Sequence, residues 1–386
     1  MKRSIVVAAL GTAQTLAWGS SYYLPAILAD PIAQGLGLSR TTVFGLFSGA
    51  LLLSAVLSPP VGRAIDNWGG RGVLALSNLV LAGGLVLLGV AQGFVTLAIA
   101  WAVLGVGMAM GLYDPAFATL AGLYGRSARG PITGITLIAG FASTIGWPLS
   151  AFLDAQFGWR TACLVWAVLH IVIGLPLNRL IPRAPPPVRT SKAEGDASPA
   201  PRGAMAILAF VFAATWFVTG AMAAHLPRLF EIAGGGTTAA IAAAALVGPA
   251  QVAARLVEFG ALRMVHPLVS ARLAALLHPI GAVILAVVGP GAITAFAVLH
   301  GAGNGLLTIA KGTVPLAIFG PVGYGLRSGI LGAPARATQA ASPLLFGLLM
   351  DRMGMGVLAI SAGLSLSAFF ALLLLKARPA AAPVPA

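Results

Sequence analysis

The stretch Val61–Asn78, VGRAIDNWGGRGVLALSN, places Arg63, Asp66 and Arg71 between two long apolar runs. The run TTVFGLFSGALLLSAVLSPP precedes it, and the run LVLAGGLVLLGVAQGF follows it. A helix of about 20 apolar residues crosses the hydrocarbon core of a bilayer. The stretch is therefore a short turn between two membrane helices, and its three charges need an explanation in a chain that otherwise avoids charge.

The composition extends this interpretation to the whole chain. Of 386 residues, 59% are hydrophobic and 8% are charged, and the mean hydropathy is +0.96. Soluble domains carry about 25% charged residues. An aqueous surface cannot hide this much apolar area, so lipid is the expected solvent. The sequence predicts an all-α polytopic membrane protein.

The net charge of +14 does not indicate nucleic-acid binding. The basic residues fall in short turns between apolar runs, and no basic cluster includes stacking aromatic residues. Cys163 is the single cysteine, which excludes an intramolecular disulfide and a cysteine-based metal site. The basic N-terminus leads into an apolar segment longer than a signal-peptide core, so it is expected to be an uncleaved first span.

Apolar runs predict twelve spans in two groups of six. The expected spans are 5–27, 42–62, 72–92, 95–124, 132–153, 160–181, 204–226, 237–258, 269–289, 291–312, 328–350 and 354–375. Between the groups stands PRAPPPVRTSKAEGDASPAPRGA, whose proline and charge favour a flexible linker. The predicted organisation is an N-terminal six-helix bundle at 1–182, a cytoplasmic linker at 183–203, and a C-terminal bundle with a short cytoplasmic tail at 204–386.

Lysine and arginine concentrate in alternate turns, together with both chain ends and the linker. Because basic residues favour the cytoplasmic side, we expect an inner-membrane protein with both termini in the cytoplasm.

The two halves repeat each other. GRAIDNWGGR at 62–71 aligns without a gap with ARLVEFGALR at 254–263, which pairs Asp66 with Glu258 and Arg71 with Arg263. FLDAQFG and LLMDRMG form a second matching pair in the same order. Such a repeat predicts two six-helix halves related by an axis along the membrane normal.

The loop at 62–71 resembles the signature loop between the second and third helices of the major facilitator superfamily. Gly62, Asp66, Gly69 or Gly70, and Arg71 fit that pattern, whereas Asn67 replaces its usual arginine. FGWR at 157–160 is also similar to family members. The resemblance covers essentially the whole chain. It implies twelve helices and a secondary transporter that works by alternating access, but it does not specify the solute.

The resemblance also implies a role for the charged loop. In the family, the acid and basic residues of this loop act as a latch that holds the cytoplasmic side closed. Carried over, Gly62, Arg63, Asp66 and Arg71 would form this latch, with Glu258 and Arg263 as counterparts in the other half. The alternative is that the arginines only set topology, which would leave Asp66 unexplained.

Three ionisable residues lie deep within predicted spans, where charge is costly and usually faces a cavity. Asp114 lies in GLYDPAFATL and is a candidate proton carrier. Lys311 falls near the position equivalent to Asp114 in the second half, so an acid and a base are expected to face a central site. Arg336 is a candidate carboxylate clamp, with Gln339 one turn away. The alternatives are structural ion pairs, for Asp114 also a cap at a helix break, and for Lys311 a side chain that reaches the inner surface.

Tyr113 and Gln251 are further candidates to line the cavity, as are Trp18, Tyr22 and Tyr23. Tyr22 and Tyr23 would also suit an interfacial aromatic belt. The histidines at 170, 225 and 300 are expected to be packing partners more often than proton shuttles.

These residues predict a proton-coupled transporter of a small organic anion, with the solute, the proton and membrane lipid as partners. The alternative is a drug or metabolite efflux antiporter, for which GFASTIGWPLSAF at 140–152 gives a partial motif. A receptor or scaffold of the same fold would not need three buried charges. The sequence has no phosphate-binding loop, metal-ligand spacing or nucleophile–base arrangement, so no enzyme activity, cofactor or metal is expected. We expect a monomer.

Overall fold

The computed structural model describes residues 1–183 and 203–376, and every regular element in this part of the chain is a helix. The first half contains α1 (Arg3–Ser20), α2 (Pro25–Leu36), α3 (Arg40–Trp68), α4 (Gly70–Gly89), α5 (Phe94–Gly111), α6 (Tyr113–Tyr124), α7 (Arg129–Ala139), α8 (Ala142–Leu169) and α9 (Leu175–Leu180). The second contains α10 (Ala204–Ile232), α11 (Thr237–Ala245), α12 (Val247–Gly260), α13 (Pro267–Val288), α14 (Ile293–Phe319), α15 (Tyr324–Met353) and α16 (Val357–Leu373). The predicted linker at 183–203 lies almost entirely outside the described residues.

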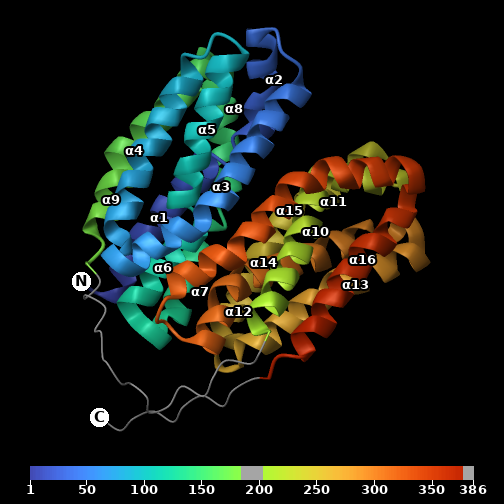
Figure 1. Cartoon of the computed structure of the whole chain (residues 1–386). Coiled ribbons are helices and arrows are strands. Elements are labelled where there is room, and N and C mark those ends of the chain that lie inside the picture. The colour runs from blue at the N-terminus through green and yellow to red at the C-terminus, as the bar shows by residue number, and fades with distance from the viewer. Residues whose placement is uncertain (184–202, 377–386) are drawn as a thin grey trace.

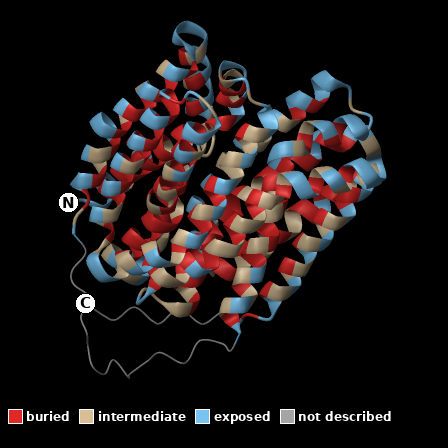
Figure 2. Ribbon diagram, turned by 45° about the horizontal axis from the view of Figure 1, so that its top comes forward, coloured by how far each residue is buried: buried red, intermediate tan, exposed pale blue. Residues whose placement is uncertain are grey.

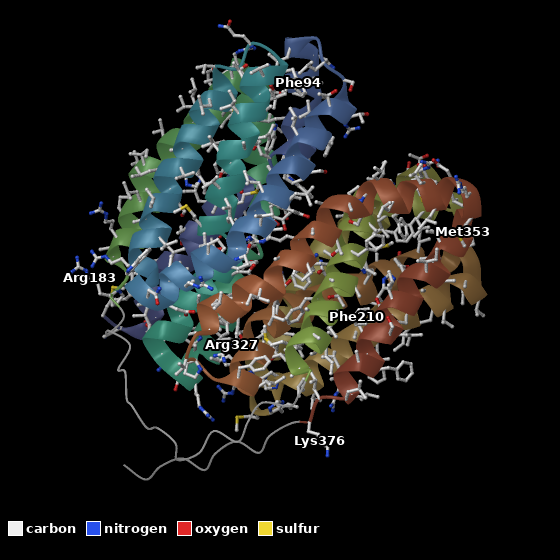
Figure 3. The ribbon with its side chains drawn as sticks, in the orientation of Figure 1. Phe94, Arg183, Phe210, Arg327, Met353 and Lys376 are labelled. Atoms are coloured by element: carbon white, nitrogen blue, oxygen red, sulfur yellow. The ribbon has the colours of Figure 1, made fainter. Side chains whose placement is uncertain are left out.

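The two halves form separate helical bundles that meet at one end of the molecule (Figure 1). We call this the closed end. It carries Arg183, Arg327 and Lys376, whereas Phe94 and Met353 mark the opposite end, where the bundles diverge (Figure 3). Between the halves, α3 and α6 pack against α15, and α7 packs against α12 and α14. The arrangement brings residues from both halves together near the middle of the molecule.

The outer faces of the helices are apolar, as expected for a surface that meets lipid. Large hydrophobic side chains such as Val56, Val283 and Phe370 are exposed, and the pale exposed segments follow the outer faces of the bundles in Figure 2. Within the described residues, seven stretches of helix are long and apolar enough to cross a membrane. The all-helical membrane fold is therefore confirmed.

The count of twelve spans is not resolved by these stretches, because several of them join consecutive helices. The longest runs from Phe94 to Leu180, over 87 residues. Within it, α8 passes through Gly158, whose φ of 80° interrupts the helical backbone where the sequence predicts a turn between two spans. Glycine adopts this left-handed conformation without steric cost, so the chain reverses there without a loop.

Among the described residues, one apolar core lies mainly in the first half, two lie in the second half, and a smaller cluster joins the halves at the closed end. This cluster packs Phe117 and Ile132 of the first half with Leu316 and Tyr324 of the second. The contact requires glycine at position 312 of α14, because a Cβ there would overlap the ring of Phe117.

Candidate solute-binding site

The position of Asp114 follows from a fixed break between α5 and α6. Pro115 has no N–H to donate to the carbonyl of Gly111, so the helix cannot run through this point. Leu112 is extended, and the side-chain amide of Gln14 donates to the freed Gly111 carbonyl at 2.6 Å. Asp114 consequently lies in the first turn of α6, where the helix N-terminus favours a negative charge.

Asp114 forms ion pairs with two cations from the other half. Lys311 Nζ of α14 lies 2.8 Å from Asp114 Oδ1, and Arg336 Nη2 of α15 lies 2.9 Å from Oδ2. The exposed fractions are only 4% for Asp114 and 7% for each cation. We call these three residues the charged triad. It joins the two halves and carries one positive charge in excess.

The second edge of the Arg336 guanidinium is bound by α3. Nη1 donates to Ser54 Oγ at 2.8 Å and to Ser58 Oγ at 2.6 Å. The two serines are four residues apart and so lie on one face of the helix. The guanidinium is therefore held between a carboxylate and two hydroxyls, in a plane that suits bidentate binding of a carboxylate.

A small cavity of about 30 Å³ lies beside the charged triad. Both halves contribute to its wall, which consists of Trp18, Tyr22, Leu51, Ser54, Leu112, Tyr113, Asp114, Phe117, Trp216, Thr308, Lys311, Arg336 and Gln339. Gln339 donates to the hydroxyl of Tyr22 at 2.8 Å. The ammonium of Lys311 lies 5.0 Å from the centre of the Trp216 ring, in cation–π geometry.

The structure thus brings together Asp114, Lys311, Arg336, Gln339 and Tyr113, but it places Gln251 elsewhere. Gln251 is absent from the cavity wall. The backbone of α12 at Gln251 packs directly on Gly305 of α14, and its side chain accepts from Arg255 at 3.4 Å. Arg255 in turn donates to the carbonyl of Thr136 in α7 at 3.0 Å. Gln251 therefore belongs to the contact between α12 and α14, and it reaches α7 only through Arg255.

The partners of Asp66 at the closed end differ from the expected arginines. Asp66 Oδ1 accepts from the N–H of Gly325, and Oδ2 accepts from the N–H of Leu326, both at 2.8 Å. These groups belong to the first turn of α15, so the carboxylate caps a helix of the other half. Gly62 makes this possible, because a Cβ there would overlap the carbonyl of Gly325.

Glu258, the repeat counterpart of Asp66, also reaches the opposite half. Its Oε1 lies 2.8 Å from Arg129 Nη2, at the start of α7. The same nitrogen donates to the carbonyl of Leu262 at 2.9 Å. Thus each acid of the repeated loop contacts the beginning of a helix in the other bundle. Arg63, Arg71 and Arg263 form no ion pair within the described residues.

His266, in the connection between α12 and α13, lies near this contact. Burial lowers its pKa, and the charges of Arg129 and Arg272 lower it further. The neutral ring suits its role, since Nδ1 accepts from the N–H of Leu268 at 3.2 Å and caps α13.

The three candidate histidines are hydrogen-bonded within their own bundles and do not line the cavity. His170 lies 2.7 Å from Ser20 Oγ and 3.0 Å from Asn78 Oδ1. His225 contacts the carbonyl of Pro343 at 2.7 Å, and His300 pairs with His278 at 3.1 Å. This placement agrees with packing roles.

Sequence reasoning missed several residues of the site. Ser54 and Ser58 have a visible signal in their four-residue spacing within an apolar run, and Trp216 is an aromatic residue in the middle of a predicted span. In the sequence, Arg129 is one of the basic residues in the turns predicted to face the cytoplasm, and nothing else distinguishes it. Its pairing with Glu258 depends on the approach of the two halves.

Comparisons with known proteins identify relatives of the chain. The sequence profile described as Major Facilitator Superfamily matches residues 10–297. An MFS-type efflux pump of Mycolicibacterium smegmatis is 32% identical over 164 residues, which are 41% of this chain and 37% of that protein. The match thus spans well under two thirds of that relative's length.

Solved structures share the fold over nearly the full chain. The human organic anion transporter MFSD10 (TETRAN) has a TM-score of 0.74 at 17% identity, covering 96% of this chain and 100% of that one. The Escherichia coli fucose:proton symporter FucP has a TM-score of 0.71 at 15% identity, with 97% and 99% covered. The proton:xylose symporter XylE has a TM-score of 0.75 at 13% identity, with 97% and 96% covered.

Proposed function

The chain belongs to the Major Facilitator Superfamily of transporters, and from this premise we propose that it moves a small organic anion across the membrane, coupled to protons. The observation that carries the proposal is the charged triad beside the central cavity. Two buried cations share one carboxylate there, so the site lacks one negative charge. Burying unbalanced charge is costly, so the site favours the binding of an anion.

Proton coupling is proposed to arise from competition for Arg336. An anion that binds the guanidinium displaces Asp114 Oδ2, with which Arg336 now pairs at 2.9 Å. Having lost one of its two cations, the Asp114 carboxylate holds a proton more readily. Solute binding and proton binding then favour each other. The organic anion transporter and the two proton symporters among the structural relatives are consistent with this chemistry.

We assign twelve crossings, six in each half, with domains at 1–182 and 204–386 joined by the linker. Length supports this count, because 87 residues of helix at about 1.5 Å each would extend to about 130 Å, several times the bilayer core of about 30 Å. The predicted spans follow the helices of each half, and α8 contributes to two of them, one on either side of Gly158.

Alternating access requires contacts between the halves to break and reform. The contacts at the closed end are suited to this role, because hydrogen bonds and ion pairs are lost completely when the bundles separate by a few ångströms. Asp66 with the start of α15, and Glu258 with Arg129, are the proposed latch.

Asp66→Asn is expected to open the closed end in a larger fraction of molecules. Removing charge-assisted bonds worth about 1–3 kcal/mol shifts a two-state ratio roughly 5- to 150-fold. Trp68 and Met264 are both exposed at the closed end. Spin labels at these two positions report the opening as a longer label-to-label distance in double electron–electron resonance. Asp351→Asn is the matched control, because Asp351 pairs with Arg228 inside one half. Unchanged distances in Asp66→Asn would remove Asp66 from the latch.

The closed end is proposed to face the cytoplasm. In a Cys163→Ser background, a cysteine at Met264 should resist an impermeant thiol reagent in intact cells, whereas one at Gln156 should react; both side chains are exposed. Labelling in permeabilised cells confirms that Met264→Cys is reactive. Labelling at position 264 with protection at position 156 in intact cells would show that the closed end faces the outside, and would contradict this proposal.

The direct test of the proposed function is a thermal-shift screen of organic anions, neutral solutes and cations, followed by flux measurements in proteoliposomes. We expect stabilisation by organic anions and their exchange across the bilayer. Transport limited to neutral or cationic solutes would contradict the proposal.

Efflux is the second candidate, favoured by the partial match to the MFS-type efflux pump. The two directions differ in the sign of coupling. An inward proton gradient drives solute outward through an antiporter and inward through a symporter. The direction of flux under an imposed pH gradient therefore distinguishes the two.

A further inference from the structure

The wall of the central cavity is unusually aromatic for a site that holds three charges. Trp18, Tyr22, Tyr113, Phe117 and Trp216 all line it. The rings of Tyr113 and Phe117 are stacked with 9° between their planes, and the ring centres of Trp18 and Tyr113 are 4.9 Å apart. Apolar aliphatic residues at these positions would exclude water equally well. The rings therefore indicate a preference for a solute that is flat or that has a π-electron system.

The aromatic surface continues from the cavity to an exposed residue. The ring centres of Tyr23 and Trp18 are 6.0 Å apart, and those of Trp147 and Tyr23 are 5.9 Å apart. Trp147 is 42% exposed, and its indole N–H donates to the carbonyl of Tyr23 at 3.2 Å. Trp18 of α1, Tyr23 of the connection to α2 and Trp147 of α8 thus form a continuous series of rings from the cavity wall to a partly exposed residue.

Trp18 also offers an unused hydrogen-bond donor. Its indole Nε1 is buried and has no partner among the described residues. Trp101 is in the same situation, but Trp101 lies in the core of the first half and does not line the cavity. A buried donor without an acceptor is destabilising. An oxygen atom of a bound solute would satisfy Trp18.

We propose that the solute is an aromatic carboxylate, a flat ring that bears one carboxylate group. This inference rests on the proposed transport of organic anions and narrows it. The carboxylate binds the guanidinium of Arg336 in place of Asp114, and the ring lies against Tyr113 and Trp18 once movement of the bundles has widened the cavity, whose volume of about 30 Å³ holds only water-sized molecules. The single excess charge of the triad matches a single carboxylate.

Three probes of nearly equal size separate the two requirements. Benzoate has the charge and the ring, cyclohexanecarboxylate has the charge without the aromatic ring, and benzamide has the ring without the charge. Binding to the purified full chain is measured by isothermal titration calorimetry. Because one aromatic contact changes affinity by roughly 2- to 12-fold, we expect benzoate to bind about tenfold more tightly than cyclohexanecarboxylate, and benzamide not to bind.

Variants of Tyr113 test whether the ring contact causes this preference. Tyr113→Leu should bring the affinities of benzoate and cyclohexanecarboxylate together, whereas Tyr113→Phe should keep them apart, since it retains the ring. Phe370→Leu is the matched control for loss of a ring, because Phe370 is 60% exposed on the outer face of α16.

The outcomes distinguish this inference from the proposed function. Equal binding of both carboxylates would overturn the aromatic preference and leave organic-anion transport standing. Binding of benzamide without either carboxylate would overturn both. If benzoate fails to bind at millimolar concentration, the assignment of aromatic carboxylates is wrong, and the anion screen decides the wider proposal.

Discussion

Replacing Arg336 by lysine is expected to weaken the binding of an organic anion about 10- to 100-fold. The guanidinium now binds Asp114 through one nitrogen and the hydroxyls of Ser54 and Ser58 through the other. Lysine keeps the charge, so the balance with Asp114 is preserved. It cannot supply two parallel donors, so both the bidentate contact with a carboxylate and the support from α3 are lost.

The affinity is measured by calorimetry with the anion selected in the thermal-shift screen. Arg228→Lys is the matched control, because Arg228 pairs with Asp351 at 2.8 Å on an exposed surface. That variant should bind as the natural chain does. If Arg336→Lys binds with unaltered affinity, Arg336 is not the clamp.

Asp114→Asn is expected to abolish accumulation of the anion driven by a pH gradient, while exchange of internal for external anion continues. Asparagine has nearly the same shape as aspartate but cannot carry a proton between the two sides. Loss of the competing carboxylate frees Arg336, so affinity for the anion should rise, roughly tenfold for a typical coupling energy. Both activities are measured in the same proteoliposomes, with and without an imposed gradient.

Stability must be controlled in this experiment. Removing one member of a buried ion pair commonly costs about 3–5 kcal/mol, and here two cations would lose their shared partner. The double variant Asp114→Asn/Lys311→Gln removes one charge of each sign and leaves Arg336 as the only charge of the cluster. It should fold, exchange the anion, and remain insensitive to the gradient. Gradient-driven accumulation in either variant would remove Asp114 from the coupling mechanism.

The charged triad could be anticipated in part from the sequence. A charge within an apolar run is visible by itself, and the repeat places Asp114 and Lys311 at nearly equivalent positions of the two halves. Their contact follows if the halves face each other. The involvement of Ser54 and Ser58 could not be derived in this way. It depends on the rotation of α3 and on its close approach to α15, where Gly62 and Gly325 meet.

At the closed end, the sequence identifies the two acids but not the groups that they bind. The sequence shows that Asp66 and Glu258 are related by the repeat, and both reach the opposite half in the structure. The partner of Asp66 is a pair of backbone N–H groups, which every residue except proline possesses. Composition therefore gives no sign of them. Similarly, the break at Leu112 could be expected from Pro115, but its stabilisation by Gln14 could not.

The helices do not correspond one to one with the predicted spans, for a physical reason. Breaks within a crossing, as at Leu112, divide one predicted span into two helices, whereas Gly158 lets the chain turn without leaving helical geometry on either side. Helix count and span count consequently diverge, although the apolar runs themselves coincide with the helices.

The central claim is that binding of the anion to Arg336 favours binding of a proton to Asp114. It is tested most directly by the number of protons taken up when the anion binds to the purified chain. Calorimetry at one pH, in two buffers with different heats of protonation, measures this number without a membrane gradient. The account predicts net proton uptake in the natural chain and none in Asp114→Asn/Lys311→Gln. Binding without proton uptake in the natural chain, or equal uptake in both proteins, would contradict it.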